Sequence, residues 1–307
     1  FMCEKHSEAF SATVKPAPDA ATVDKRYLFE RDHFGRIAHS VPLFLVNGNH
    51  EGEFGFLFKG TGDDLATWAT QARKTFYLNP TPDGFYTGDE LPQPVVGQRA
   101  AWYAWQWGDA LMVVLDPYWN VSKKSKDAWD LTLGKAQYDW LAKTLAGSSA
   151  KWKFVFLHNL VGGLDGAMRG GVEAAPFFEW GGANADGTPG FAQKRPGWGK
   201  PIHPLLVEHK VTAVFHGHDH LYVHQQLDGV VYQEVPQPSA KNTQNGAQLA
   251  KDYHYEAGTA LASAGHLRIT VGPAAVTGEY VRAWLPAAEK GGQSNGQIAH
   301  SWTVGSK

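Results

Sequence analysis

The stretch Val211-Thr212-Ala213-Val214-Phe215-His216-Gly217-His218-Asp219-His220 carries an apolar run directly into two closely spaced histidines. Two earlier apolar runs end in a similar way: residues 42–46 lead into Gly48-Asn49-His50-Glu51, and residues 152–157 lead into His158. Short runs rich in Val, Phe and Leu predict buried strands, and ligands bind at strand ends in α/β sheets. The repetition therefore predicts a metal site along one edge of a sheet.

The length and composition predict one globular domain. The chain has 307 residues, of which 43% are hydrophobic and 19% are charged, which is enough to bury one large core. We therefore expect a single domain over residues 1–307 that ends in a strand-rich segment from about residue 220.

The charge pattern and the cysteine content exclude several classes of protein. The formal net charge is −2 and charges of both signs are interspersed, so no nucleic-acid partner is expected. No apolar stretch approaches the roughly 20 residues that a membrane-spanning helix needs. Cys3 is the only cysteine, which rules out an internal disulfide and a thiolate zinc cage. Any metal ligands must therefore be His, Asn or carboxylate side chains.

Hydrophobic periodicity predicts an α/β fold in which sheets are flanked by helices. Helices are predicted over residues 19–40, 65–76, 134–145 and 201–209. Strands are predicted for the three apolar runs and over residues 101–107, 110–115, 221–226, 230–235, 266–271 and 276–283, with a hairpin turn at Gly108-Asp109. The Gly-rich segment 162–199 holds several Trp and Phe residues, which favours a packed loop that forms a lid or pocket wall.

The three motifs together resemble the calcineurin-like metallophosphoesterase superfamily, and more closely its purple-acid-phosphatase-like branch. That family combines Gly-Asn-His-(Asp or Glu), a lone His after a strand, and Gly-His-x-His, which match Gly48–Glu51, His158 and Gly217–His220. The resemblance runs from Val41 to about Arg282. It implies a four-layer α/β/β/α sandwich of two mixed sheets.

Two earlier motifs of that family, Asp-x-His and Gly-Asp, have no match. Asp63 and Asp109 each follow a glycine, but both come after Asn49, so the order of the motifs excludes them. We therefore expect the N-terminal strands of the fold, with the aspartate that bridges the two metal ions, to be absent from this stretch. Weak or no activity of the stretch alone follows from that expectation.

The resemblance implies a dinuclear metal site and a phosphate ester substrate. Asn49, His158 and His218 would bind one ion and His220 the other, with Fe, Mn or Zn as the metals. His50 would stabilise the transition state and protonate the leaving oxygen, while a metal-bound hydroxide attacks phosphorus in line. His216 and Asn159 are expected to contact the substrate. The substrate would be a small phosphomonoester or phosphodiester.

Less specific interpretations stay open for several of these residues. A lone His after a strand, such as His158, is often a hydrogen-bonded structural residue, and Asp116 is better explained as a turn-forming carboxylate than as a ligand. Asn159 and Arg169 could brace a loop as well as meet a phosphate.

Two other classes of protein remain as alternatives. One is a non-catalytic metal-binding or ligand-binding protein on the same fold, and the other is a Trp-rich carbohydrate-binding module. The resembled branch is often exported, which favours an extracytoplasmic bacterial location. The residues leave the oligomeric state open.

Overall fold

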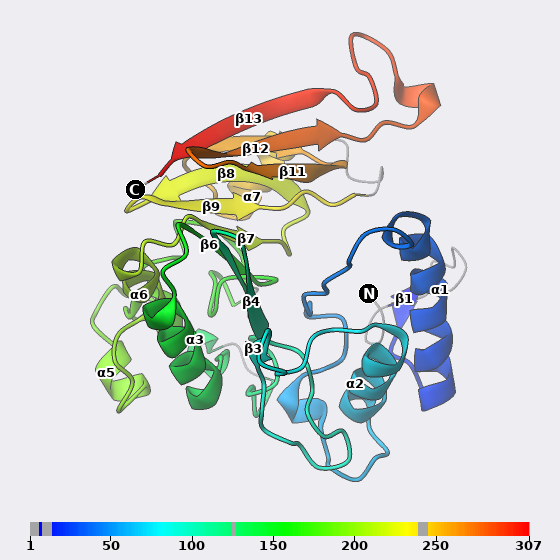
Figure 1. Ribbon diagram of the computed structural model, residues 1–307, viewed down its shortest axis with the longest axis vertical. Helices are drawn as coiled ribbons and strands as arrows, with labels where there is room; N and C mark the ends of the chain where they lie inside the picture. Colours follow the sequence, from blue (N-terminus) through cyan, green and yellow to red (C-terminus); the bar gives the residue numbers. More distant parts are fainter. Residues whose placement is uncertain (1–5, 8–13, 125–126, 167, 239–244, 307) are drawn as a thin grey trace. The chain divides into compact units, whose positions relative to one another are not determined.

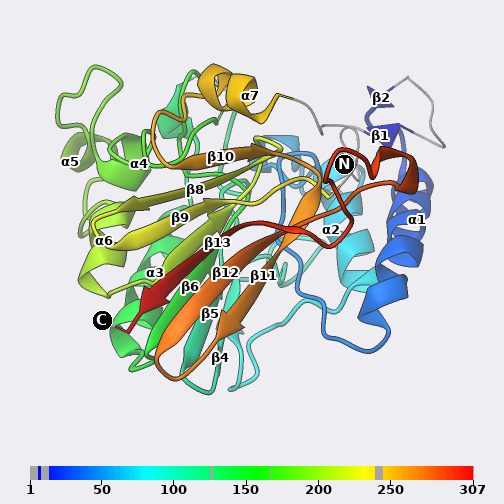
Figure 2. The ribbon, with the colours of Figure 1, turned by 90° about the horizontal axis from the view of Figure 1, so that it is seen from above.

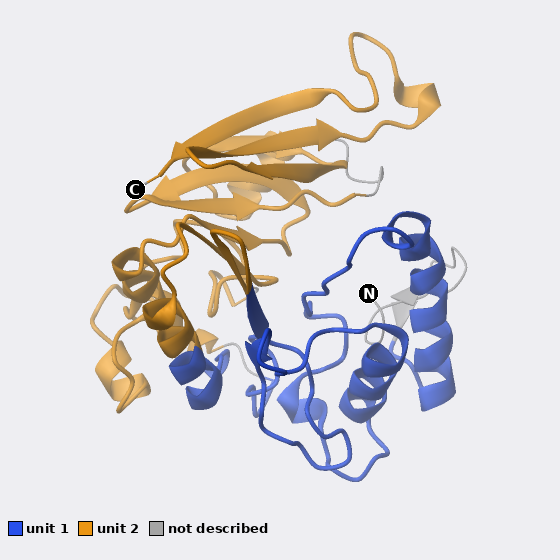
Figure 3. Ribbon diagram, in the orientation of Figure 1, with its two compact units in different colours: residues 1–105, 114–125, 130–140 blue, residues 106–113, 126–129, 141–307 orange. Residues whose placement is uncertain are grey.

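The computed structural model describes residues 6–7, 14–124, 127–166, 168–238 and 245–306 (Figure 1). Cys3 lies outside these residues. The chain divides into two compact units, coloured separately in Figure 3. Unit 1 comprises residues 1–105, 114–125 and 130–140, and unit 2 comprises residues 106–113, 126–129 and 141–307.

Two helices, α1 (Ala20–Ala38) and α2 (Leu65–Phe76), build the core of unit 1. Each begins at an aspartate whose carboxylate accepts a hydrogen bond from the backbone three residues on: Asp19 from the Thr22 amide and Asp64 from the Thr67 amide, both at 2.7 Å. Their inner faces supply Val23, Tyr27, Ala69 and Ala72 to one core cluster, and Tyr77, which follows α2, completes it. Both helix predictions are confirmed.

The predicted strand over residues 42–46 is wrong, because these residues pair with no neighbouring strand in the described part of the chain. Side chains take the place of a strand partner. The Leu45 amide donates to Asn79 Oδ1 at 3.1 Å, and the Leu45 carbonyl accepts from the Tyr103 hydroxyl at 2.9 Å. An apolar run favours burial, but a strand also needs a neighbour that offers its own backbone groups.

The larger sheet is mixed and has the strand order β10-β8-β9-β7-β6-β5-β4-β3. In chain order its strands are β3 (Thr87–Gly88), β4 (Tyr103–Trp107), β5 (Ala110–Val114), β6 (Trp152–Phe156), β7 (Ala213–His216), β8 (Leu221–Leu227), β9 (Val230–Glu234) and β10 (Thr259–Ala262). β7 runs parallel to β6 and β9, whereas β8 is antiparallel to β9 and β10. The strands predicted at 101–107, 110–115, 152–157, 211–215, 221–226 and 230–235 are confirmed.

A second sheet of three antiparallel strands contains β11 (Gly265–Val271), β12 (Ala275–Arg282) and β13 (Ile298–Gly305). Figure 2 shows it lying over part of the larger sheet within unit 2. The two sheets meet at a core that includes Phe154, Phe215, Val231, Val276 and Trp302. The predicted α/β class and the packing of two sheets are therefore confirmed.

Helices cover the other face of the larger sheet. Successive residues of a strand point to opposite faces, so Val231 lies in the core between the sheets while Tyr232 meets the helices. The Tyr232 hydroxyl accepts a 2.9 Å hydrogen bond from Trp180 Nε1 of α4 (Phe178–Gly181) and lies 2.6 Å from His203 Nδ1 of α6 (Ile202–Glu208).

The remaining elements show where periodicity was informative. α3 (Lys135–Gly147) and α6 match predicted helices, and segment 162–199 is irregular apart from α4 and α5 (Phe191–Lys194). The sequence did not predict α7 (Gly246–Asp252), β3, β10 or β13, or the short pair β1 (His6–Ser7) and β2 (Val14–Lys15). Among the described residues, no helix is both long and apolar enough to cross a membrane.

Candidate functional site

His158 and His218 lie side by side in unit 2 because the strands before them are neighbours. β6 and β7 are parallel, with Phe156 opposite Phe215, so their carboxyl ends reach the same edge of the sheet. The pairing continues beyond the strands, since the Gly217 amide donates to the His158 carbonyl at 2.8 Å. His218 Nδ1 lies 3.3 Å from His158 Nε2, and the two rings are nearly perpendicular at 83°.

This spacing fits two ligands of one cation. Two nitrogens that each lie about 2.0–2.1 Å from a tetrahedral ion are about 3.3–3.4 Å apart. Neutral imidazole is also a suitable donor for Zn, Fe and Mn. Among the described residues, no group of three or more His, Cys, Asp or Glu side chains could hold a metal, so a complete site needs donors beyond this pair.

Asn49 and His50 lie in unit 1, on a turn that follows Gly48. The turn is closed locally: the Glu51 carboxylate accepts from the Gly48 amide, and the Glu51 amide donates to the Gly48 carbonyl at 3.4 Å. Asn49 and His50 are both partly exposed. That they converge with His158 and His218, which belong to unit 2, stays a prediction.

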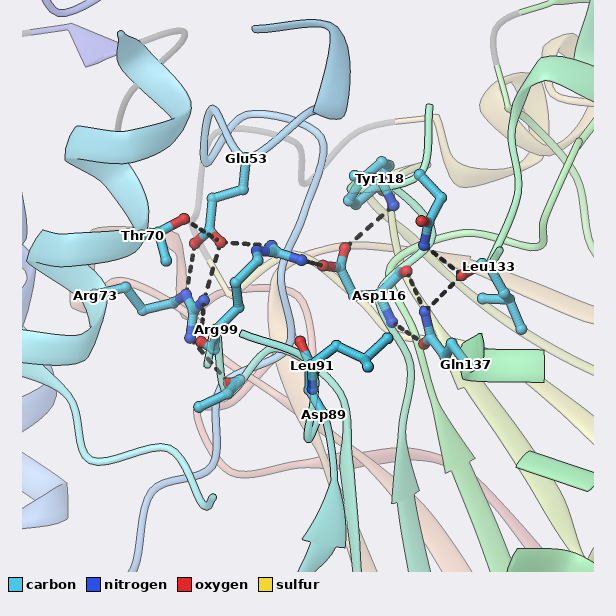
Figure 4. Close-up of polar contacts among 12 residues, drawn as sticks. Glu53, Thr70, Arg73, Asp89, Leu91, Arg99, Asp116, Tyr118, Leu133 and Gln137 are labelled. Atoms are coloured by element: carbon cyan, nitrogen blue, oxygen red, sulfur yellow. Dashed lines mark hydrogen bonds and ion pairs between the residues drawn. The ribbon is translucent and has the colours of Figure 1, made fainter. Parts of the chain in front are cut away.

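A buried charge network lies just beyond that turn in the chain (Figure 4). Glu53 is 2% exposed and accepts from Thr70 Oγ1 at 3.0 Å, Arg73 Nε at 2.6 Å and Arg99 Nη2 at 2.6 Å. Arg99 Nη1 also lies 2.8 Å from Asp116 Oδ2. Burial alone raises the pKa of Glu53, but the guanidinium ions of Arg73 and Arg99 outweigh it and lower that pKa to about 2. Glu53 is thus charged and held rigidly four residues after Asn49.

Asp116 forms the turn that the sequence predicts. Its Oδ1 accepts from the Tyr118 amide at 3.1 Å, and its own amide donates to Gln137 Oε1 at 2.8 Å. Burial raises the pKa of Asp116, and the neighbouring charge of Arg99 opposes that rise. The Asp116 carboxylate therefore has a structural role, in the turn and in the pair with Arg99.

His216 and Asn159, the expected substrate contacts, are both 2% exposed. His216 Nδ1 lies 2.7 Å from Glu234 Oε2, and burial lowers the pKa of His216 to about 4, so its imidazole is neutral. Asn159 Nδ2 donates to the Leu160 carbonyl at 2.9 Å. Both side chains therefore interact with other residues of the protein, and their contact with a substrate stays a prediction.

His218 and His220 lie on the turn after β7, and the sequence assigned no role to the residue between them. The residue between them, Asp219, is 2% exposed and makes an ion pair with Arg169, whose Nη1 lies 2.6 Å from Asp219 Oδ1. Arg169 therefore braces a loop, as one of the two sequence-based interpretations has it. In the sequence, only the position of Asp219 inside Gly-His-Asp-His indicated that this carboxylate lies beside the proposed ligands.

Comparison with known proteins identifies the fold. No protein-family model matches the chain, and no curated protein matches it in sequence. A solved structure titled "Structure of PhoD" superposes with a TM-score of 0.60 at 13% identity, covering 100% of this chain and 62% of the other. Purple acid phosphatase PPD1 from yellow lupin (Lupinus luteus) seeds superposes with a TM-score of 0.50 at 16% identity. That match covers 93% of this chain and 44% of the phosphatase.

The chain has the calcineurin-like metallophosphoesterase fold. The resemblance that the motifs suggest is therefore confirmed at the level of the fold. The chain spans less than two thirds of the length of either solved structure. In this metallophosphoesterase fold, the histidine pair lies at the carboxyl ends of β6 and β7, where α/β sheets place their ligands.

Proposed function

We propose that the chain takes part in metal-dependent hydrolysis of a phosphate ester. The observation that carries the proposal is the 3.3 Å approach of His158 Nε2 and His218 Nδ1 at the ends of two parallel neighbouring strands. The neighbours in fold, PhoD and a purple acid phosphatase, support the same class of chemistry.

The proposed roles follow the chemistry of each side chain. His158 and His218 hold one cation with the amide oxygen of Asn49, and His220 serves a second cation. When bound, the metal ions offset charge on the phosphoryl oxygens and lower the pKa of water. His50, which is partly exposed, donates a proton to the leaving oxygen. His216 and Asn159 remain the proposed substrate contacts, although both are buried.

Metal binding tests this proposal more directly than turnover. We expect zinc titration calorimetry to show binding by the wild-type chain and at least a tenfold loss of affinity in His158→Ala and in His218→Ala. His33→Ala, which changes an exposed histidine on α1, is the matched control. Equal zinc affinity in all four proteins would exclude the histidine pair as a ligand set.

Hydrolysis of p-nitrophenyl phosphate and bis(p-nitrophenyl) phosphate with added Zn, Mn or Fe then separates the functional classes. We expect weak hydrolysis, because the Asp-x-His and Gly-Asp motifs of the resembled family have no match. His50→Ala should remove this activity and leave zinc affinity unchanged.

A non-catalytic metal-binding protein is the second candidate function. It is favoured by the small donor set: the described residues bring His158 and His218 together but form no group of three or more His, Cys, Asp or Glu donors, which is fewer than a dinuclear catalytic centre needs. Zinc binding by the wild-type chain without hydrolysis of either ester under any of the three metals would support it. A carbohydrate-binding module is disfavoured, because several tryptophans lie in buried positions: Trp102, Trp105, Trp129, Trp152, Trp180 and Trp302.

A further inference from the structure

The turn that carries His218 and His220 has an unusual backbone. His218 has φ of 86° and His220 has φ of 60°, so both lie in the left-handed region. A residue with a Cβ atom enters that region at a cost in free energy, and such residues persist where surrounding contacts hold them. The contacts that hold this turn should therefore matter for the two histidines.

Asp219, the residue between the histidines, makes those contacts. Its Oδ1 accepts from Arg169 Nη1 at 2.6 Å, and its Oδ2 accepts from the Gly170 amide at 3.0 Å and the Tyr255 hydroxyl at 2.8 Å. Its own amide donates to Glu234 Oε1 at 2.9 Å. Three separate segments of unit 2 thus form hydrogen bonds with one residue of the turn.

Arg169 ties the same turn at a second point. Its Nη1 also donates to the His218 carbonyl at 3.3 Å, and its guanidinium lies 4.1 Å from the centre of the Tyr253 ring. The guanidinium is therefore fixed by stacking on one side and by two acceptors of the turn on the other. Because Arg169 offsets the charge of Asp219, the carboxylate is suited to hold geometry more than to attract a cation.

We propose that Asp219 is a positioning residue that holds His218 and His220 in a metal-binding arrangement. Its effect on metal affinity rests on the proposed function, whereas its effect on the turn does not. The residue does not touch the metal. It acts through the backbone of the turn, with Arg169, Gly170, Tyr255 and Glu234 as its supports.

Hydrogen–deuterium exchange of the metal-free chain, together with zinc titration calorimetry, tests the proposal. Asp219→Ala should speed amide exchange in peptides covering residues 217–221 and weaken zinc binding 10-fold to 100-fold, as expected for a residue behind the ligands. Tyr255→Phe, which removes one hydrogen bond, should give smaller changes in the same direction. Glu279→Gln, which breaks the exposed ion pair with Arg268 on β11 and β12, should change neither.

The two readouts separate the possible failures. Unchanged exchange at residues 217–221 in folded Asp219→Ala overturns the positioning role. If that variant fails to fold, unchanged exchange in Tyr255→Phe overturns it instead. Faster exchange with unchanged zinc affinity overturns the link between the turn and the metal. A wild-type chain that binds no zinc refutes the proposed metal site, and that link with it, while exchange still decides whether Asp219 holds the turn.

Discussion

Glu53 is a single carboxylate on which two buried guanidinium ions depend. Its side chain is 1% exposed, and those of Arg73 and Arg99 are 1% and 0% exposed. A buried ion pair gains little net stability, because both charges lose their hydration, but removal of one partner leaves the other charged and unpaired. The network should therefore tolerate loss of Glu53 poorly.

We expect Glu53→Gln to lower the free energy of unfolding by about 3–5 kcal/mol, because Arg73 would remain buried without an anion and Arg99 would keep only Asp116. Urea denaturation measures the change. Asp139→Asn, which breaks the pair between Lys135 and Asp139 with both side chains about half exposed, should cost less than about 1 kcal/mol. Similar losses in the two variants would contradict a special role for burial.

At the scale of elements, a helix is best predicted where its boundary residues carry their own signal. α2 begins and ends where the sequence places it, and Asp64 caps it. Asp64 Oδ2 also accepts from the Lys59 amide at 3.1 Å, so one carboxylate fixes both the helix and the chain before it.

We expect Asp64→Ala to destabilise the chain by about 1 kcal/mol or somewhat more, because the Thr67 amide loses its acceptor in a buried position. Thermal unfolding of the variant measures the loss. Asp63→Ala is the control, since Asp63 is the exposed neighbour of Asp64. If the two substitutions had equal effects, the cap would have no energetic importance.

The strand predictions succeeded and failed for one physical reason. A strand exists only with a neighbour, and hydrophobic pattern reports burial, not pairing. β6 and β7 have neighbours, so the prediction that His158 and the Gly-His-x-His turn share an edge holds for His158 and His218. Residues 42–46 have a similar composition, but Asn79 and Tyr103 satisfy Leu45 instead.

Neither the Glu53 charge network nor the hydrogen bonds that hold Asp219 could be predicted from one sequence. Glu53 meets Arg99, and Asp219 meets Arg169, across long separations in the chain. No local sequence pattern indicates which carboxylate each arginine pairs with, since either guanidinium could have paired with another carboxylate or remained in solvent. Motif spacing located the candidate ligands, but only the packed fold shows what supports them.

For the molecule as a whole, the partly buried His224 and the buried His216 and Glu53 predict how stability changes as the pH falls. The His224 ring stacks on the Trp302 ring, with 5.2 Å between the ring centres, and lies near His300 in the space between the two sheets of unit 2. Burial, followed by the charge of His300, lowers the pKa of His224 from 6.5 to about 4. The folded state therefore favours the neutral ring, and the unfolded chain binds the proton first.

We expect stability to fall in two successive ranges of pH. The stability that neutral His224 contributes is lost as the pH falls from about 6.5 towards 4. The stability that ionised Glu53 contributes is lost as the pH falls from about 4.5 towards 2, because its pKa in the folded state is lowered to about 2. Unfolding midpoints measured from pH 7 to pH 3 would record both. His224→Phe should reduce the loss of stability in the first range, to which His216 also contributes, and Glu53→Gln should reduce the loss in the second. If the pH profile of a variant matched that of the wild type, the loss of stability in that range would have to come from other residues.

The balanced charges of the Glu53 network also restrict how this chain can evolve. Two acidic and two basic side chains share one buried space: Glu53, Asp116, Arg73 and Arg99. Replacement of one of them alone passes through an intermediate with an unmatched charge, whereas a paired exchange for apolar residues of similar volume does not. In related sequences, these four positions should therefore change together or not at all.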